Sequence, residues 1–241
     1  MQRKKFIQLS TAGLVGLSSV SFSHFQSKLS KDDLMGKGNP ILVGEGYKLR
    51  KKAHQAFLKM KSAALKQDIK LKVVSSYRDY AHQNRIWERK YERYTANGLS
   101  PIKAIHKIIE YSTIPGTSRH HWGTDLDIVD GSVKQPRDVL LTKHFHDDGP
   151  FTRFKTWMDH NASDYGFHLV YTNKKGRKGF KYEPWHFSYA PSSIPMLNEF
   201  KKLDIKTELQ KTILMGSSNF TSDFIQQYMN ENVLDINPEL L

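Results

Sequence analysis

Two short stretches of the sequence carry side chains that could bind one metal ion together. SRHHWGTDLDIV places His120 in a loop and Asp127 in the strand that follows, and EPWHFSY supplies His186. A loop histidine that folds back over the strand could meet Asp127 at a metal, and His186 would complete a His-Asp-His set. Three protein ligands leave a fourth position open, as catalytic zinc requires. The chain has no cysteine, so only His, Asp and Glu are available as ligands.

Glu183, three residues before His186, has the chemistry of a general base for such a site. A carboxylate beside an activated water can take its proton and pass it to a leaving amine. In a regular strand, residues three apart point to opposite faces, which argues against a shared site. Pro184 cannot donate to a strand ladder, so a bulge or strand end there could bring both side chains to one side. Taken alone, the stretch could also be the end of a buried strand.

Helices mixed with short strands must position these residues. Apolar residues at helical spacing, with capping residues at their ends, predict helices over 47–67, 79–95, 101–111 and 151–165. LKVVSS (71–76) is predicted to be a buried strand and TDLDIV (124–129) an alternating strand, whereas IPGTSRHHWG between them is predicted to be a loop. FHLVYT and FKYEPWHFSY flank a basic, glycine-containing loop and are predicted to form a hairpin. The expected fold is therefore α+β, a small, mainly antiparallel sheet packed with helices and carrying the metal site on its face.

The two ends of the chain differ from the middle. MQRKKF is followed by an uncharged, moderately apolar run and by small residues at Ser21 and Ser23, the layout of a secretory signal. We expect residues 1–23 to be an export signal, residues 24–194 the catalytic domain and residues 195–241 a helical extension. The apolar run is too short and polar for a membrane span, so the mature chain is expected in the periplasm or cell envelope without one.

The composition restricts the partners. With 241 residues and 38% apolar residues, the chain is long and apolar enough to bury a core. Its formal charge is +13, but no helix-turn-helix, zinc-finger or RNA-binding signature accompanies the charge, so nucleic acid is not an expected partner. The lysines are spread along the chain, which fits either a solvated surface or attraction to an anionic cell-envelope polymer. We expect a monomer.

Three motifs in the right order resemble one known family. Ser118-x-His120-x-x-Gly123-x-x-x-Asp127 followed by Glu183-x-Trp185-His186 resembles the paired signature of the VanY-type zinc D-alanyl-D-alanine carboxypeptidases. The upstream SSYRDYAHQNRIW is similar to the Ser-x-Tyr-Arg segment of that family with its downstream Gln. The resemblance covers residues 39–190 and implies the fold shared with lysostaphin-type peptidases and the hedgehog domain. Three motifs in register are more specific than any one of them.

The resemblance assigns roles residue by residue. It implies zinc ligands His120, Asp127 and His186, with Glu183 as the base. Arg78 would hold the terminal carboxylate of the substrate or the developing oxyanion, a role that suits the fixed donor geometry of guanidinium.

Other residues would support substrate binding. Gln83 would help to bind the peptide, and Ser118 and Trp185 would support the site. Asp125 stands where the family usually has alanine. It shares a strand face with the aspartate ligand, so it could be a partner of the ligands, a binder of a substrate amine or an exposed charge. Because of this departure, the motif does not predict the shape of the substrate pocket or the exact substrate.

The resemblance therefore implies an exported zinc metallopeptidase that removes the terminal D-alanine from peptidoglycan stem peptides. Within enzymes, the alternatives are an L,D-carboxypeptidase or an endopeptidase of cross-links. In another class, the chain could be a non-catalytic, zinc-bearing binding domain, but a base at Glu183 together with Arg78 argues against it. HFHDD (144–148) also resembles a metal site but lies in a polar loop.

Overall fold

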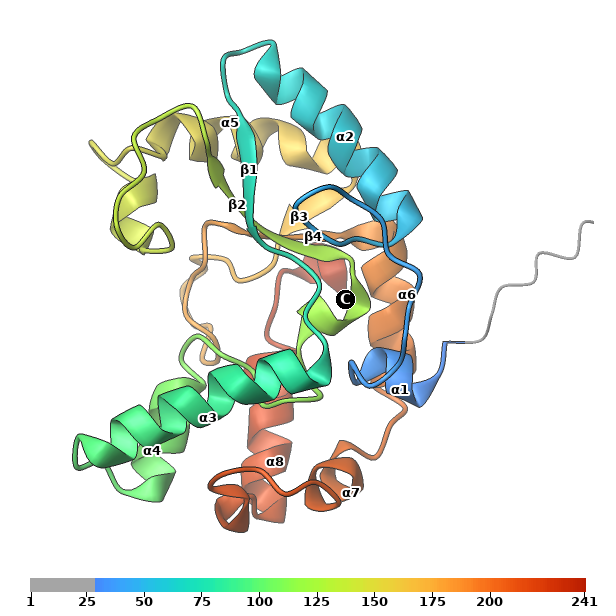
Figure 1. Cartoon of the computed structure of the whole chain (residues 1–241), viewed down its shortest axis with the longest axis vertical. Coiled ribbons are helices and arrows are strands. Elements are labelled where there is room, and N and C mark those ends of the chain that lie inside the picture. The colour runs from blue at the N-terminus through green and yellow to red at the C-terminus, as the bar shows by residue number, and fades with distance from the viewer. Residues whose placement is uncertain (1–28) are drawn as a thin grey trace, which may run out of the picture.

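The computed structural model describes residues 29–241, in which helices pack around a small sheet (Figure 1). The sheet has four strands in the order β1-β2-β4-β3, and every neighbouring pair is antiparallel. The strands are β1 (Leu71–Ser75), β2 (Asp125–Asp130), β3 (Phe167–Leu169) and β4 (His186–Tyr189). This architecture confirms the predicted α+β class. The export signal predicted for residues 1–23 lies outside the described residues.

The helices follow the predicted positions closely in the first two-thirds of the chain. They are α1 (Lys31–Leu34), α2 (Lys51–Leu65), α3 (Tyr80–Ala96), α4 (Pro101–Ile108), α5 (Thr152–Asn161), α6 (Ala190–Phe200), α7 (Ile205–Gln210) and α8 (Ser222–Tyr228). Helix α3 begins after Asp79, whose carboxylate accepts a hydrogen bond from the His82 backbone N–H. Asp79 is therefore the N-cap of the helix predicted to start at this residue.

Short helical turns connect these elements. They are η1 (Arg119–Trp122), η2 (Thr142–Phe145), η3 (Ala162–Tyr165), η4 (Ser217–Asn219), η5 (Met229–Val233) and η6 (Pro238–Leu240). Turn η1 corrects the prediction that IPGTSRHHWG is loop throughout. Ser118 caps the turn, with its Oγ 3.3 Å from the His120 backbone N–H, so a short 3₁₀ turn forms within the loop.

Two apolar clusters form the core. The sheet cluster joins α2 and α5 to the sheet through residues such as Phe57, Leu126 and Phe154. The helical cluster joins α3, α4, α6 and α8 through residues such as Trp87 and Leu197. In Figure 1 the sheet, α2 and α5 lie in the upper part of the molecule, and α3, α4 and α8 lie below.

The C-terminal residues belong to this same helical core. Helix α6 crosses the boundary proposed at residue 194, and Ile225, Tyr228 and Leu240 are buried with Trp87 of α3. The division of the chain into a domain of residues 24–194 and an extension of residues 195–241 therefore stays a prediction. No helix within residues 29–241 combines the length and apolar character needed to cross a bilayer.

Two strand predictions need correction. Strand β1 pairs only with β2, so it lies at the edge of the sheet, and Val74 is 39% exposed instead of buried. The predicted hairpin pairing is confirmed by Phe167 opposite Tyr189, but its strands are much shorter than predicted. Residues 170–185 leave the sheet because Tyr171 and Phe180 pack in the helical cluster.

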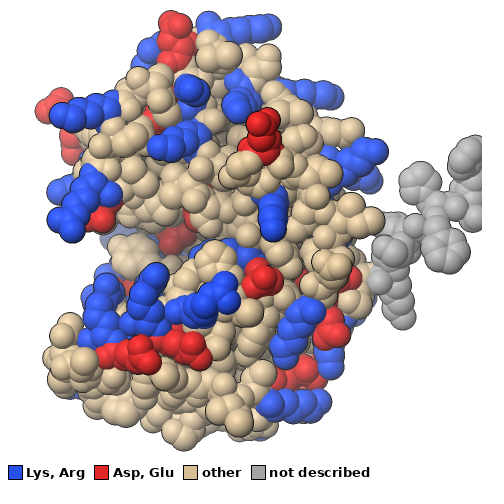
Figure 2. Space-filling model, in the orientation of Figure 1, with Lys and Arg blue, Asp and Glu red and all other residues tan. Residues whose placement is uncertain are grey.

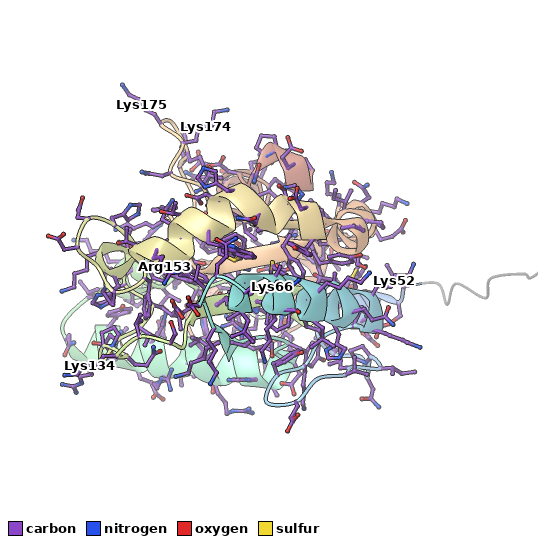
Figure 3. The ribbon with its side chains drawn as sticks, turned by 90° about the horizontal axis from the view of Figure 1, so that it is seen from above. Lys52, Lys66, Lys134, Arg153, Lys174 and Lys175 are labelled. Atoms are coloured by element: carbon purple, nitrogen blue, oxygen red, sulfur yellow. The ribbon has the colours of Figure 1, made fainter. Side chains whose placement is uncertain are left out.

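The positive charge is spread over the surface. Figure 3 shows α2 and α5 side by side over the sheet, with Lys52, Lys66 and Arg153 on this face and Lys174 and Lys175 at the tip of a distant loop. All five side chains are exposed. The arrangement fits the solvated basic surface that the sequence allows.

Candidate metal centre

The central strands bring two of the three proposed ligands together. Asp127 of β2 lies opposite His186 of β4 in the antiparallel register. His120 reaches them from η1, which ends at Gly123 with a φ of 65°. This left-handed conformation favours glycine, and it turns the chain from η1 into β2. A Cβ at Gly123 would also lie 2.7 Å from a methyl group of Leu42.

The three side chains form a compact, buried set. Nε2 of His120 lies 3.5 Å from one carboxylate oxygen of Asp127, and Nδ1 of His186 lies 4.0 Å from the other. The three ligand atoms all lie within 4.8 Å of one another, and the residues are at most 6% exposed. Ligands about 2.1 Å from a tetrahedral zinc ion are about 3.4 Å apart, close to this spacing.

One oxygen of the set needs a partner. Oδ1 of Asp127 is buried and accepts no hydrogen bond within the described structure. A buried carboxylate oxygen without a partner costs free energy, which a bound cation would remove. Within residues 29–241, His120, Asp127 and His186 form the one group of three His, Asp or Glu residues placed to hold a metal. The donor set and its geometry therefore fit a zinc ion.

Hydrogen bonds on the far side of each ring fix which nitrogen faces the metal position. Nδ1 of His120 donates to the Ser76 carbonyl over 2.8 Å, which leaves Nε2 toward Asp127. Nε2 of His186 donates to Asp125 over 3.0 Å, which leaves Nδ1 toward Asp127. Partners of this kind set the tautomer and increase the basicity of histidine ligands. These hydrogen bonds thus orient both rings toward the metal position.

The Asp125 carboxylate connects the His186 ring to three other hydrogen-bond donors. Its carboxylate accepts hydrogen bonds from Thr124, Ser188, Arg119 and His186, and the side chain is 0% exposed. Burial alone would raise the pKa of Asp125, but the Arg119 guanidinium and the other donors hold it well below its usual range. Of the three roles considered for Asp125, the contacts favour a partner of the ligands. Asp125 is neither exposed nor part of the cavity lining.

Asp125→Asn should therefore weaken zinc binding by about 10- to 100-fold, the usual effect of losing a partner of a metal ligand. The amide keeps the size but loses the charge that balances Arg119 and polarises the His186 ring. Competition against a chelator of known affinity gives the zinc Kd. Asp130→Asn, another buried carboxylate of β2, should leave the zinc affinity unchanged. An unaltered Kd in Asp125→Asn would show that this carboxylate does not tune the ligand.

Glu183 reaches the set through a tight turn. The His186 backbone N–H donates to the Glu183 carbonyl over 3.1 Å, Pro184 occupies the second position, and β4 starts at His186. The strand end predicted from Pro184 is thus present, and both side chains lie on one side. Glu183 Oε2 is 3.0 Å from Nδ1 of His186.

Burial shapes the protonation of this pair. Burial raises the pKa of Glu183, because a desolvated carboxylate is harder to ionise. For His186, burial works in the opposite direction, but hydrogen bonds to Asp125 and Glu183 raise its pKa to about 9. A metal that binds at Nδ1 of His186 would release a proton at neutral pH.

A cavity of about 410 Å³ opens over these groups. It lies between the two apolar clusters, since Trp185 of the sheet cluster and Phe180 of the helical cluster both line it. Figure 2 shows the corresponding hollow between the upper part of the molecule and α3. The lining includes the three proposed ligands, Glu183, Arg78 and Ser118. A peptide end that enters the cavity would meet the metal position and the base together.

Arg78 is held at the wall by backbone contacts on both sides. Its N–H donates to the His120 carbonyl over 3.2 Å, and Nδ1 of His121 donates to its carbonyl over 2.6 Å. The Nε of Arg78 is buried without a partner. No carboxylate lies within 4.0 Å of the guanidinium in residues 29–241. This side chain is therefore available to a ligand.

Gln83 lies outside the cavity. It is 1% exposed, and its side-chain amide donates to the Thr113 carbonyl over 3.0 Å. The side chain thus fixes the segment of Thr113, which lines the cavity. Gln83 itself does not line the cavity, so the structure does not place it where the expected contact with the peptide could form.

Two contributors to the site could not be identified from sequence. Arg119 pairs with Asp125 and Ser188, and its only sequence signal is its place inside the motif. His121 is fully buried, and burial lowers its pKa to about 3, so the neutral ring bridges Arg78 and the Gly116 N–H. His121 thereby positions Arg78 and is not part of the His120–Asp127–His186 set.

Comparison with known proteins identifies the family. Residues 46–192 match the family model described as VanY, D-alanyl-D-alanine carboxypeptidase. The match covers more than half of the chain and includes every residue of the set above. The protein belongs to the VanY family of D-alanyl-D-alanine carboxypeptidases.

One relative of known activity agrees with this assignment. The chain is 34% identical over 132 residues to the bifunctional D-Ala-D-Ala dipeptidase and D-Ala-D-Ala carboxypeptidase VanXYC of Enterococcus gallinarum, covering 54% of this chain and 60% of that relative. The chain thus spans less than two-thirds of the length of this relative.

Two solved structures share the fold. VanYB in complex with D-alanine-D-alanine has a TM-score of 0.52 at 20% identity, over 73% of this chain and 92% of the other. A mutant of the vancomycin resistance D,D-pentapeptidase VanY in complex with Zn(II) has a TM-score of 0.50 at 24% identity, over 63% of this chain and 79% of the other.

Proposed function

We propose that this protein is a zinc-dependent carboxypeptidase that removes the terminal D-alanine from peptidoglycan stem peptides. Family membership supports the reaction. The observation that carries the proposal is the buried His120–Asp127–His186 set, with an unpartnered carboxylate oxygen and with Glu183 beside it in the lining of the same cavity. A binding domain alone would need no buried base.

The residues would hold zinc through Nε2 of His120, the carboxylate of Asp127 and Nδ1 of His186. A zinc ion bound there would polarise the scissile carbonyl and lower the pKa of a water molecule. Glu183 would take a proton from the attacking water as the water oxygen bonds to the carbonyl carbon. It would then pass the proton to the nitrogen of the leaving D-alanine as the C–N bond breaks. The raised pKa of Glu183 suits a group that accepts and returns a proton.

Arg78 would allow the enzyme to recognise the carboxyl end of a peptide. A terminal residue differs from an internal one by a carboxylate, and a guanidinium can bind both carboxylate oxygens at once. Its backbone contacts to His120 and His121 tie this recognition to the metal position.

A peptide that ends in a carboxamide should be cut at least tenfold more slowly than the free acid. A charge-assisted hydrogen bond in a partly buried place contributes about 1.5–3 kcal/mol, and about 1.4 kcal/mol corresponds to a factor of ten. Arg78→Lys should recover little of the acid preference, because an ammonium group lacks the forked geometry. The measurement is kcat/KM for both peptides with both proteins. Equal rates on acid and amide would favour an endopeptidase of cross-links.

Mass spectrometry of purified muropeptides after incubation with the protein tests which bond is cut. Loss of one terminal alanine from pentapeptides supports the proposal. Loss of a second alanine in sequence would indicate L,D activity, and loss of cross-linked species would indicate an endopeptidase.

We also propose that the protein acts outside the cytoplasm, in the periplasm or cell envelope. The basic and moderately apolar start of the sequence supports export, and stem peptides are found in that compartment. Fusion of residues 1–30 to a reporter that is active only after export would test this placement.

A further inference from the structure

The cavity contains more cationic groups than its carboxylates can pair. The charged residues that line it are Arg78, Arg89, Lys90, Arg119, Asp127 and Glu183. Arg119 is already paired with Asp125 at 3.0 Å. Within the described chain, no carboxylate lies within 4.0 Å of Arg78, Arg89 or Lys90. The terminal carboxylate of a substrate would account for Arg78, and two cations remain.

Lys90 is held in place and partly removed from water. Its Nζ donates to Ser112 Oγ over 2.5 Å, and the side chain is half-buried. Burial lowers the pKa of Lys90 to about 8, so the ammonium stays mostly charged at neutral pH but has lost part of its hydration. A partly desolvated ammonium group is stabilised by a nearby anion. An ordinary surface lysine is fully hydrated and has no fixed position, so it would not be stabilised in this way.

Arg89 lies beside Lys90 and is exposed at the rim of the cavity. In Figure 2, basic side chains follow the α3 side of the hollow, whereas acidic side chains lie lower on the same helix. Both neighbouring cations thus line the same cavity as Arg78 and Glu183.

The distance from Arg78 suits a peptide of a few residues. Arg89 is nine residues after Tyr80, the first residue of α3, which places it about 14 Å along the helix axis from the end near Arg78. Two residues of an extended peptide span about 7 Å, and a long side chain adds about 6 Å more. A carboxylate two or three residues before the chain end could therefore reach Arg89 and Lys90 while the terminal carboxylate contacts Arg78.

We infer that Arg89 and Lys90 bind a second carboxylate of the substrate, on the amino side of the bond that is cut. This inference rests on the proposed function and specifies its substrate class: stem peptides with an anionic group near the third residue. Two sources have the same chemistry. One is the side-chain carboxylate of a diamino dicarboxylic acid at the third position, and the other is the α-carboxylate of a γ-linked D-glutamate at the second.

Four synthetic pentapeptides separate these sources. Each has the sequence L-Ala-γ-D-Glu-X-D-Ala-D-Ala, where X is 2,6-diaminopimelate, and each has a free terminal carboxylate. The side-chain carboxylate of X, the α-carboxylate of glutamate, both or neither are converted to the amide. Amidation of the recognised group should lower kcat/KM of the wild-type enzyme at least tenfold, and amidation of the other should change it less than threefold. Equal rates for the diacid and the doubly amidated peptide would overturn the inference.

The double variant Arg89→Met/Lys90→Met assigns the preference to these residues. Methionine keeps apolar length but removes the charge. The ratio of rates on acid and amide should fall from tenfold or more to below threefold, whereas Lys59→Met, an exposed lysine of α2, should keep the wild-type ratio. A preference that survives in the double variant would place the recognition elsewhere. If the wild type cuts none of the four peptides, the proposed function itself fails, so the two failures are distinguishable.

Discussion

Asp127→Ala should bind no zinc at equimolar metal and should hydrolyse a D-Ala-D-Ala peptide at least about 1000-fold more slowly than the wild type. Asp127 supplies the one charged ligand of the set and contacts both histidines. Loss of the metal removes several kcal/mol of transition-state stabilisation, and each 1.36 kcal/mol is a factor of ten. His120→Ala and His186→Ala should behave in the same way, with elemental analysis giving zinc per chain and a D-alanine assay giving the rate.

His144→Ala and His146→Ala are the matched controls. Both histidines lie in HFHDD, and their rings contact Phe151 and Tyr182, away from the set. These variants should retain one zinc per chain and near wild-type activity. Full zinc content in all three ligand variants would rule out the proposed centre, and zinc loss in the His144 variant would move it to this loop.

Glu183→Gln should keep its zinc and lose activity by a factor of about 100 or more, the usual contribution of a general base. Glutamine preserves the size of the side chain in a buried turn but cannot accept the proton. The loss should appear in kcat, because the residue acts on the reacting water. Glu199→Gln, an exposed carboxylate of α6, serves as the control for the substitution itself.

A near wild-type rate for Glu183→Gln would mean that another group takes the proton. Asp125 could not replace it directly, because four donors occupy its carboxylate and it lies outside the cavity. The mechanism would then need a base from the substrate or solvent.

Local patterns in the sequence predicted that His120, Asp127 and His186 lie close together. The spacing of His120 and Asp127 around Gly123 reflects a turn that leads into a strand, and such geometry depends on adjacent residues. Pro184 likewise marked the strand end before His186, because proline cannot join a ladder. Where the structure depends on short segments of chain, residue types and spacing were sufficient.

Contacts between distant segments were not accessible in the same way. The role of Asp125 depends on Ser188 and His186, which follow it by more than sixty residues, and Lys90 depends on Ser112, which follows α4. The exposure of Val74 results from the position of β1 at the sheet edge, which the alternation of β1 alone does not reveal. The segment between β3 and β4 leaves the sheet where Tyr171 and Phe180 pack in the helical cluster, and Phe180 contacts Tyr228 of α8. These features require the tertiary arrangement.

Titration of metal-free protein with zinc, followed by release of D-alanine from a stem pentapeptide, tests whether the protein is a zinc-dependent carboxypeptidase. We expect no activity without metal and a linear rise up to one zinc per chain, followed by a plateau, since one set of three ligands is present among the described residues. Undiminished D-alanine release by the metal-free protein, or no release at full zinc occupancy, would show that it is not.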